Sequence, residues 1–262
     1  MNRSSSSQRA RSGAPVSAPA ERKAAARAVR HAPQQVRIIG GDWKRTPLQV
    51  VDAQGLRPTP DRVRETLFNW LGQLTGAACL DLFAGTGALG FEAASRGARR
   101  VLLVERQAKA VAQLRAVKAR LSASVVEVAE ADALRLAAGL APQSFDVIFI
   151  DPPFDSGLLS RALPVAARLA SAAGDIYVES PVPLDPETAQ ALPPGMADPA
   201  VAAAFAKMHA AGWRIVRYGK AGAVHYHLLR RGANDIDATA DATANEAADA
   251  AVKENVDQAA DE

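Results

Sequence analysis

The sequence predicts an α/β fold built on a mostly parallel sheet. From residue 78 onward, short apolar runs alternate with amphipathic segments, a glycine-rich turn follows the first run, and two closely spaced apolar runs end the pattern. Alternating strands and helices are typical of a parallel sheet that helices cover on both faces. Because only a short turn separates the last two runs, we expect them to form an antiparallel pair at one edge of the sheet.

Apolar residues at strand-like or helical spacing predict each element in turn. The expected strands are 79–83, 100–105, 125–128, 145–151, 175–179, 213–218 and 224–230. The expected helices are 88–95, 107–121, a short one from Asp132, 157–171 and one near 200–210. A proline-rich connection, 181–199, precedes the last of these helices.

A small basic appendage is predicted ahead of the sheet. Residues 35–51 contain two short extended segments around Gly40 and Gly41, and the basic side chains Arg37, Lys44 and Arg45 fall within them. This pattern indicates a hairpin-like unit. The Arg57-Pro58-Thr59-Pro60 segment that follows is expected to be a rigid loop, since each proline restricts its own φ and the residue before it.

The segment 61–71 is predicted to be a helix that ends before Gly72. Val63, Leu67, Trp70 and Leu71 recur at helical spacing and predict its apolar stripe. Arg62 and Arg64 fall off this stripe, so we expect them at the surface.

Charge divides the chain into three parts. Residues 1–35 carry a net charge of +6 and residues 233–262 a net charge of −8, and neither shows apolar periodicity, so both are expected to be disordered. Three interpretations of the N-terminal part stay open: a basic arm that holds nucleic acid, a transit-like segment and a dispensable tail. Between them we predict a β appendage at 36–56 and the main domain at 57–232. Residues 36–232 are net basic by +5, which favours polyanionic partners.

Several classes of protein are excluded or disfavoured. No run approaches the roughly 18–20 apolar residues of a membrane span. The single cysteine, Cys79, cannot form an internal disulfide and is expected in the core. His225 and His227 share a strand face without a third ligand in view, so we expect no metal site.

The glycine-rich turn predicts a nucleotide-like ligand at the carboxyl end of the first strand. Gly85, Gly87 and Gly90 have the G-x-G-x-x-G spacing, and Glu105 follows where a carboxylate can hold ribose hydroxyls. Alone, this pattern is that of a dinucleotide-dependent dehydrogenase, which stays an alternative. Asp81 at the strand end argues otherwise, because it would repel a pyrophosphate and attract a cationic group such as an amino group.

The Asp151-Pro152-Pro153-Phe154 segment directly follows a buried strand and predicts a site for an exocyclic amine. The Asp151 carboxylate and the Pro152 carbonyl can both accept hydrogen bonds from one planar amino group, and Phe154 offers a stacking face for a base. Such acceptors orient a weakly nucleophilic amine and stabilise the positive charge that develops on it.

Taken in order, these residues resemble a known family. The run 81–90, Glu105, Asp132 and the run 151–154 together resemble class I S-adenosylmethionine-dependent methyltransferases that act on amines. More narrowly, residues 37–43, 56–71 and 177–180 resemble the bacterial 16S rRNA (guanine(966)-N2)-methyltransferase family.

The resemblance implies a Rossmann-like class I methyltransferase fold, with a seven-stranded, mostly parallel sheet, an antiparallel edge strand and a small N-terminal β appendage. It implies methyl transfer from S-adenosyl-L-methionine to N2 of guanine 966 in 16S rRNA, within the 30S subunit or an assembly intermediate, by a monomer in the bacterial cytoplasm. Adenine N6 of DNA, an amine of another RNA, or a non-catalytic RNA-binding role stay open as alternatives.

The resemblance also assigns residues to roles. Those expected to act on the target amine are Asp151, Pro152 and Phe154. Those expected to hold the cofactor are Asp81, Phe83, Gly85, Thr86, Gly87, Glu105 and Asp132. Those expected to contact RNA are Arg37, Lys44, Arg45, Arg57, Arg62 and Arg64, and no metal is expected.

Overall fold

The computed structural model describes residues 35–50, 60–185 and 198–232. The predicted N-terminal extension up to residue 34, the acidic tail 233–262, Arg57 and most of the proline-rich connection lie outside the described residues.

A seven-stranded sheet forms the centre of the fold, in the order β5-β4-β3-β6-β7-β9-β8. The strands are β3 (Ala78–Asp81), β4 (Arg100–Glu105), β5 (Val126–Glu130), β6 (Phe145–Ile150), β7 (Ala170–Ser180), β8 (Trp213–Ala221) and β9 (Val224–Arg231). The chain runs outward from β3 to β5 and then returns to β6 on the other side of β3. This reversal makes the carboxyl ends of β3 and β6 the topological switch point, where open α/β sheets bind ligands.

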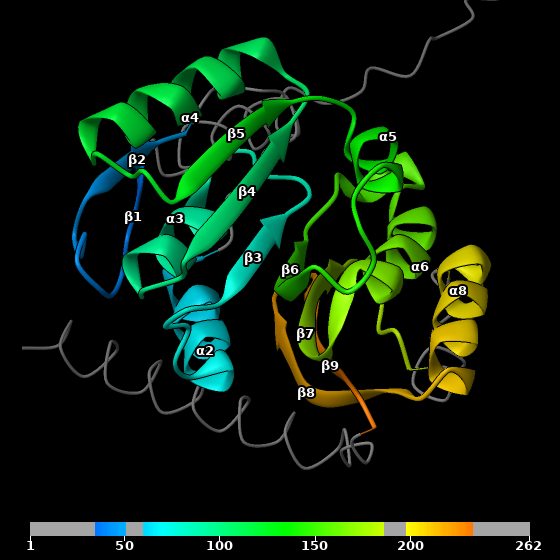
Figure 1. The fold of residues 1–262 in the computed structure, drawn as a ribbon. Coiled ribbons are helices and arrows are strands. Elements are labelled where there is room, and N and C mark those ends of the chain that lie inside the picture. The colour runs from blue at the N-terminus through cyan, green and yellow to red at the C-terminus, as the bar shows by residue number, and fades with distance from the viewer. Residues whose placement is uncertain (1–34, 51–59, 186–197, 233–262) are drawn as a thin grey trace, which may run out of the picture. The chain divides into compact units, whose positions relative to one another are not determined.

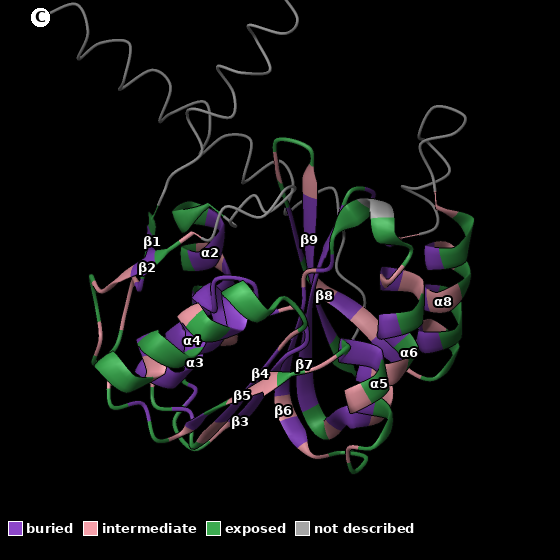
Figure 2. Ribbon diagram, turned by 90° about the horizontal axis from the view of Figure 1, so that it is seen from above, coloured by how far each residue is buried: buried purple, intermediate pink, exposed green. Residues whose placement is uncertain are grey.

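Helices cover both faces of the sheet, as predicted. Those on one face are α2 (Asp61–Leu71), α3 (Ala88–Ser95) and α4 (Ala108–Arg120), and those on the other are α5 (Ala133–Ala138), α6 (Leu159–Leu169) and α8 (Pro199–Ala210). Figures 1 and 2 show the two helical layers, and the buried strands between them are purple in Figure 2. Apolar side chains on each face of the strands pack against the helices of that face in two clusters.

The last two strands pair antiparallel, as expected, but the detail at the edge differs. The strand that runs against the others is β9, which lies between β7 and β8, so β8 forms the edge. Strand β7 also begins at Ala170, before the expected 175, and a register shift separates its pairing of Ala170 with Phe145 from its pairing of Asp175 with Val147. Helix α6 therefore ends at Leu169.

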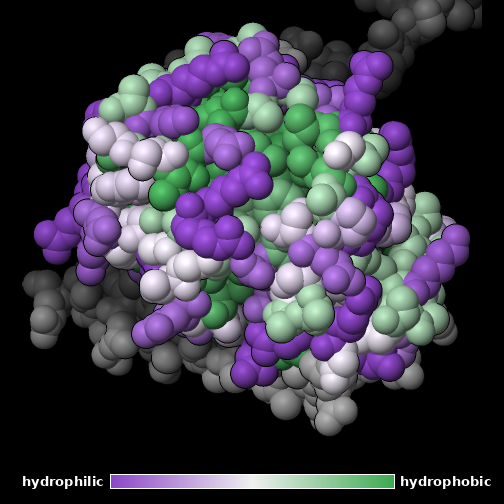
Figure 3. Space-filling view, in the orientation of Figure 1, coloured by the Kyte–Doolittle hydropathy of each residue, from purple (hydrophilic) through white to green (hydrophobic). Residues whose placement is uncertain are grey.

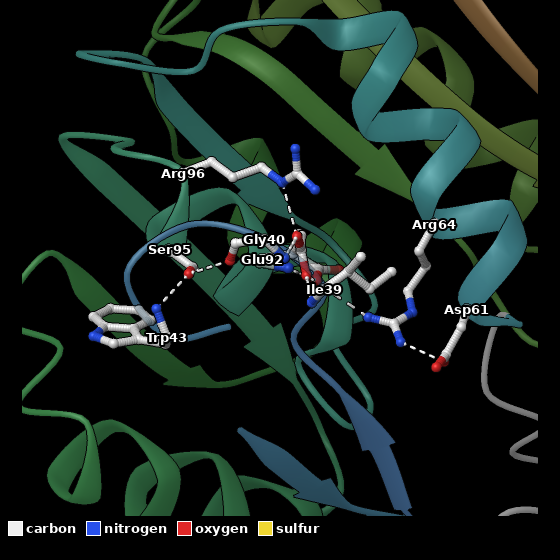
Figure 4. A network of polar contacts seen from close by, with 10 residues as sticks. Ile39, Gly40, Trp43, Asp61, Arg64, Glu92, Ser95 and Arg96 are labelled. Carbon is white, nitrogen blue, oxygen red and sulfur yellow. Dashed lines mark hydrogen bonds and ion pairs between the residues drawn. The ribbon is translucent and has the colours of Figure 1, made fainter. Parts of the chain in front are cut away.

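The predicted appendage is a two-stranded antiparallel sheet, β1 (Gln35–Arg37) and β2 (Pro47–Gln49). It is attached to α3 through polar contacts (Figure 4). The Glu92 carboxylate accepts hydrogen bonds from the backbone N–H groups of Ile39 (2.6 Å) and Gly40 (2.8 Å). The Ser95 hydroxyl accepts one from the Trp43 N–H (2.9 Å) and donates one to the Gly40 carbonyl (2.6 Å). The main domain therefore determines where the turn of the appendage lies.

Arg64 corrects the predicted face of α2. Its side chain is fully buried and pairs with Asp61 at 2.7 Å, while a second guanidinium nitrogen lies 3.9 Å from Glu92 (Figure 4). The prediction that Arg64 contacts RNA at the surface is wrong in this structure. Its place in the apolar stripe is explained by Glu92, which supplies a buried carboxylate from another helix.

One face of the surface combines apolar and polar areas. Hydrophilic side chains border the hydrophobic area seen in the upper half of Figure 3. Among the described residues, Phe154 is the one exposed large hydrophobic side chain, at 40%. Within the same residues, no helix is long and apolar enough to cross a membrane, and no three metal-ligating side chains cluster.

Candidate functional site

The glycine-rich loop joins the end of β3 to the start of α3, and its glycines are required by packing. Gly87 has a φ of +77°, and a Cβ there would lie 2.6 Å from side-chain atoms of Phe91 and Leu114. A Cβ on Gly90 would lie 2.1 Å from Leu103 Cδ2. The loop therefore turns tightly and brings α3 close to β4, at the carboxyl end of β3.

Asp81 ends β3 as a buried carboxyl, 3% exposed. Its Oδ2 accepts a hydrogen bond from the Gly90 N–H at 3.2 Å. Burial raises the pKa of Asp81 to about 7, although hydrogen bonds from Gly90 and Phe83 act in the opposite direction. A cation that approaches this carboxyl would stabilise its ionised form.

Glu105 ends β4 and links two loops. Its Oε2 accepts a hydrogen bond from the Gly85 N–H at 3.0 Å, and its Oε1 accepts from the Arg106 and Gln107 N–H groups at 2.8 Å each. These bonds hold the carboxylate in one orientation at the rim of the switch point. Oε1 already accepts two donors and Oε2 accepts one, so the second lone pair of Oε2 is left for a hydroxyl donor of a ligand.

The other predicted cofactor residues lie in the same loops. Asp132 follows β5 and caps α5, where its Oδ1 accepts a hydrogen bond from the Arg135 N–H at 2.9 Å. Asp132 is exposed, Phe83 is half-buried and Thr86 is buried. The carboxyl ends of β3, β4 and β5, which are adjacent strands, thus carry the whole predicted set.

The Asp-Pro-Pro-Phe segment lies on the other side of the switch point. Asp151 follows β6 directly and is half-buried, Pro152 is buried, and Phe154 opens a 3₁₀ helix (Phe154–Ser156) with its ring exposed. A small pocket beside it is lined by residues that include Pro152, Phe154, Ser180 and Val182. The segment therefore adjoins a hollow that the end of β7 also lines.

Of the described basic residues predicted to contact RNA, all but the buried Arg64 lie at the surface. Arg37, Lys44 and Arg45 are exposed on the appendage, and Arg62 is exposed on α2.

Sequence reasoning singles out two buried polar residues of this region only as part of the family-like stretch 177–180. Tyr177 and Glu179 lie at the end of β7, 0% and 3% exposed, and the Tyr177 hydroxyl donates a hydrogen bond to Glu179 Oε1 at 2.9 Å. A carboxylate in an otherwise apolar strand is the signal in the sequence. Glu92 in the apolar helix α3 carries the same signal, which sequence reasoning missed.

Comparison with known proteins identifies the family. A family model described as "Conserved hypothetical protein 95" matches residues 36–190. The chain belongs to this family. A curated relative, Ribosomal RNA small subunit methyltransferase D of Escherichia coli, is 44% identical over 151 residues, which are 56% of this chain and 76% of the relative. The protein of the same name from Haemophilus influenzae is 43% identical over 138 residues, 49% of this chain and 69% of the relative.

A solved structure agrees with the fold. The Escherichia coli protein yhhF, provisionally described as a methyltransferase, is 36% identical and superposes with a TM-score of 0.59, covering 76% of this chain and 99% of yhhF. The chain is therefore a methyltransferase of this family with a Rossmann-like fold, and the resemblance inferred from the sequence is confirmed. The glycine spacing alone suggested hydride transfer, but the names of these relatives state methyl transfer.

The residues at the switch point fit S-adenosyl-L-methionine in chemical type. Asp81 offers a buried carboxyl to an ammonium group, and Glu105 offers a fixed carboxylate to ribose hydroxyls. The tight loop at Gly85 and Gly87 allows close approach of a ligand. No pyrophosphate-binding feature is needed to explain this set, and Asp81 would disfavour one.

Proposed function

We propose that this chain transfers a methyl group from S-adenosyl-L-methionine to the exocyclic N2 amine of guanine 966 in 16S rRNA. The observation that carries the proposal is the placement of Asp151 and Asp81 at the ends of β6 and β3, on either side of the switch point. Support comes also from the relatives, whose names state that they are methyltransferases of small-subunit ribosomal RNA.

Asp151 and Pro152 act on the amine. The Asp151 carboxylate accepts one amine hydrogen and the Pro152 carbonyl accepts the other, which orients the nitrogen lone pair and stabilises the charge that develops on it. The carboxylate can then receive the released proton or pass it to water. The exposed ring of Phe154 supplies a stacking surface for the base.

The opposite side of the switch point holds the methyl donor. The amino-acid end of the methyl donor would be held by Asp81, Phe83, Gly85, Thr86 and Gly87. Glu105 would accept a hydrogen bond from a ribose hydroxyl on Oε2, and Asp132 would accept one from the adenine amino group. When bound, S-adenosyl-L-methionine supplies an electrophilic methyl group on a sulfonium.

The exposed cations of the appendage and of α2 are proposed to contact RNA phosphates. Arg37, Lys44, Arg45 and Arg62 carry this role, together with Arg57 from the sequence. Contacts between basic side chains and phosphates orient the protein on the RNA but do not read the base sequence. We further propose that the substrate is the 30S subunit or an assembly intermediate, that the enzyme acts as a monomer in the bacterial cytoplasm, and that no metal takes part.

Methyl transfer from labelled S-adenosyl-L-methionine tests the proposal directly. The substrates are 30S subunits that lack the modification, naked 16S rRNA and duplex DNA, and the labelled product is mapped by mass spectrometry. We expect label on one guanine of 16S rRNA, as N2-methylguanine. Label on adenine N6 of DNA, or no label on any ribosomal RNA despite cofactor binding, would contradict the proposed substrate.

A further inference from the structure

Glu179 lies beside Asp151 at the carboxyl end of the parallel strands, where the target amine is proposed to bind. Strands β6 and β7 are parallel, and Ile150 of β6 is registered with Val178 of β7. Asp151 is the first residue after β6, and Glu179 is the residue of β7 that follows Val178. Adjacent strands are separated by about 4.8 Å, so the two carboxylate-bearing residues are close neighbours.

The two carboxylates also face the same side of the sheet. Side chains alternate along a strand, so Glu179 lies on the same side of the sheet as Tyr177. Extending the alternation of β6 by one residue places Asp151 on the same side as Phe149. The rings of Phe149 and Tyr177 contact each other on the α2 side of the sheet, with centroids 6.4 Å apart. Burial raises the pKa of the Tyr177 phenol well above its usual value, and the charges of Glu179 and Asp151 raise it further. Both carboxylates are therefore near the same phenol.

Glu179 is held in a fixed position. It is 3% exposed, its Oε1 accepts a hydrogen bond from the Tyr177 hydroxyl, and it is registered with Tyr226 of β9, whose ring packs on Trp70 of α2. A buried carboxylate is costly unless hydrogen-bond donors satisfy it. A carboxylate has about four acceptor sites, so it can accept donors beyond one phenol.

The edge of guanine differs from other amine-bearing edges in a way that this pair can detect. Guanine presents two neighbouring donors, the N1–H and the N2 amine, whereas adenine and cytosine present a ring-nitrogen acceptor beside their amine. We propose that Glu179 accepts the N1–H of the target guanine while Asp151 accepts the N2 amine, so that Glu179 makes the site specific for guanine. The inference rests on the proposed function and names a determinant of its base specificity.

Base analogues at the target position test the assignment with the unmodified protein. 6-Thioguanine keeps the N1–H and the 2-amine but replaces O6, whereas 2-aminopurine keeps the 2-amine but carries an acceptor at N1. We expect 6-thioguanine to be methylated nearly as fast as guanine. We expect 2-aminopurine to be methylated roughly 10- to 100-fold more slowly, the range for a lost hydrogen bond to a charged group. Equal rates for guanine and 2-aminopurine would overturn the proposal.

The Glu179→Gln variant tests the residue itself. A glutamine amide can donate to the N1 acceptor of 2-aminopurine, so the preference for guanine over 2-aminopurine should fall at least roughly tenfold. Tyr177→Phe is the matched control: it removes the phenol donor but keeps the carboxylate, so the preference for guanine should stay. Thermal melting and cofactor binding of each variant report whether it folds.

The outcomes separate this proposal from the proposed function. If the unmodified protein labels no guanine of ribosomal RNA, the proposed function fails. If it labels guanine and Glu179→Gln keeps the same preference for guanine, the role of Glu179 fails while the proposed function stands. If Glu179→Gln does not fold, the analogue series with the unmodified protein still decides.

Discussion

Glu105 at the end of β4 accepts a hydrogen bond from the backbone N–H of Gly85, 20 residues earlier in the chain, at 3.0 Å. The same carboxylate accepts two further N–H groups on its other oxygen. One side chain thus joins the glycine-rich loop to the turn after β4, and the two segments that are proposed to hold the cofactor are coupled.

Glu105→Gln should weaken both cofactor binding and the loop. One amide face of glutamine is a donor, and it would oppose backbone N–H groups on whichever side it lies. We expect a loss of roughly 1–3 kcal/mol in binding of S-adenosyl-L-methionine, measured by calorimetry. The control is Glu130→Gln, which changes an exposed carboxylate at the end of β5. This variant should bind S-adenosyl-L-methionine as tightly as the unmodified protein does. Equal affinity of the two variants would show that Glu105 does not hold the ligand.

Asp81 should make cofactor binding depend on pH. Burial raises the pKa of Asp81 to about 7, so the protonated form of this carboxyl dominates below neutral pH. Below that pH, an ammonium group that binds beside Asp81 must displace a proton. We expect affinity to fall about tenfold per pH unit below pH 7 and to level off above it. Calorimetry in buffers of different ionisation enthalpy counts the released proton.

The matched variant for this prediction is Asp81→Asn. It should bind more weakly and with a flat dependence on pH between 5 and 8, because no carboxyl remains to titrate. A pH dependence that persists in this variant would assign the titration to another group.

The attachment of the appendage to α3 should be sensitive to Gly41. Its φ is +71°, and a Cβ would lie 1.8 Å from the Ser95 carbonyl oxygen. Gly222 has a similar φ of +61°, but no heavy atom lies within 4 Å of the position that a Cβ would take, so it is a control for backbone strain alone. We expect Gly41→Ala to lower the free energy of unfolding by about 1–3 kcal/mol more than Gly222→Ala, measured by denaturant melts. Equal losses would mean that the turn does not pack on α3 as described.

Glu92 should be among the most costly residues to neutralise. It is buried and accepts hydrogen bonds from two backbone N–H groups of the appendage. It also forms an ion pair with Arg96 at 2.7 Å, beside the buried Arg64. Removing one partner of a buried ion pair costs roughly 3–5 kcal/mol, and here the N–H groups of Ile39 and Gly40 also lose their acceptor. We expect Glu92→Ala to lose about that amount and to speed hydrogen exchange at Ile39 and Gly40. Glu65→Ala, on the exposed face of α2, should change neither.

Local patterns predicted most of the fold because apolar spacing reflects which face of an element is buried. Helix α3, the loop from Asp81 and the Asp-Pro-Pro-Phe turn lie where the sequence placed them. Arg64 was misassigned because its burial depends on Glu92, which is distant in sequence and lies on another helix. Trp70, predicted in the apolar stripe of α2, is half-buried and packs against the core through Tyr226.

The edge of the sheet could not be derived from local pattern either. A terminal pair of strands can dock on β7 through either member, and hydrophobic alternation is the same in both arrangements. The pairing of β9 with β7, which places Tyr226 opposite Glu179, is a tertiary result. The same holds for the neighbourhood of Glu179 and Asp151, which belong to different strands joined only through the register of β6 and β7.

Asp151 carries the central claim, and one comparison tests it most directly. Single-turnover methyl transfer to 30S subunits that lack the modification is measured for the unmodified protein and for Asp151→Ala, with cofactor affinity determined for both. The account predicts that Asp151→Ala loses at least roughly 100-fold in rate, within the range for a positioned acid–base group, while cofactor affinity is unchanged. Methyl transfer at the unmodified rate by Asp151→Ala would contradict the role assigned to this carboxylate.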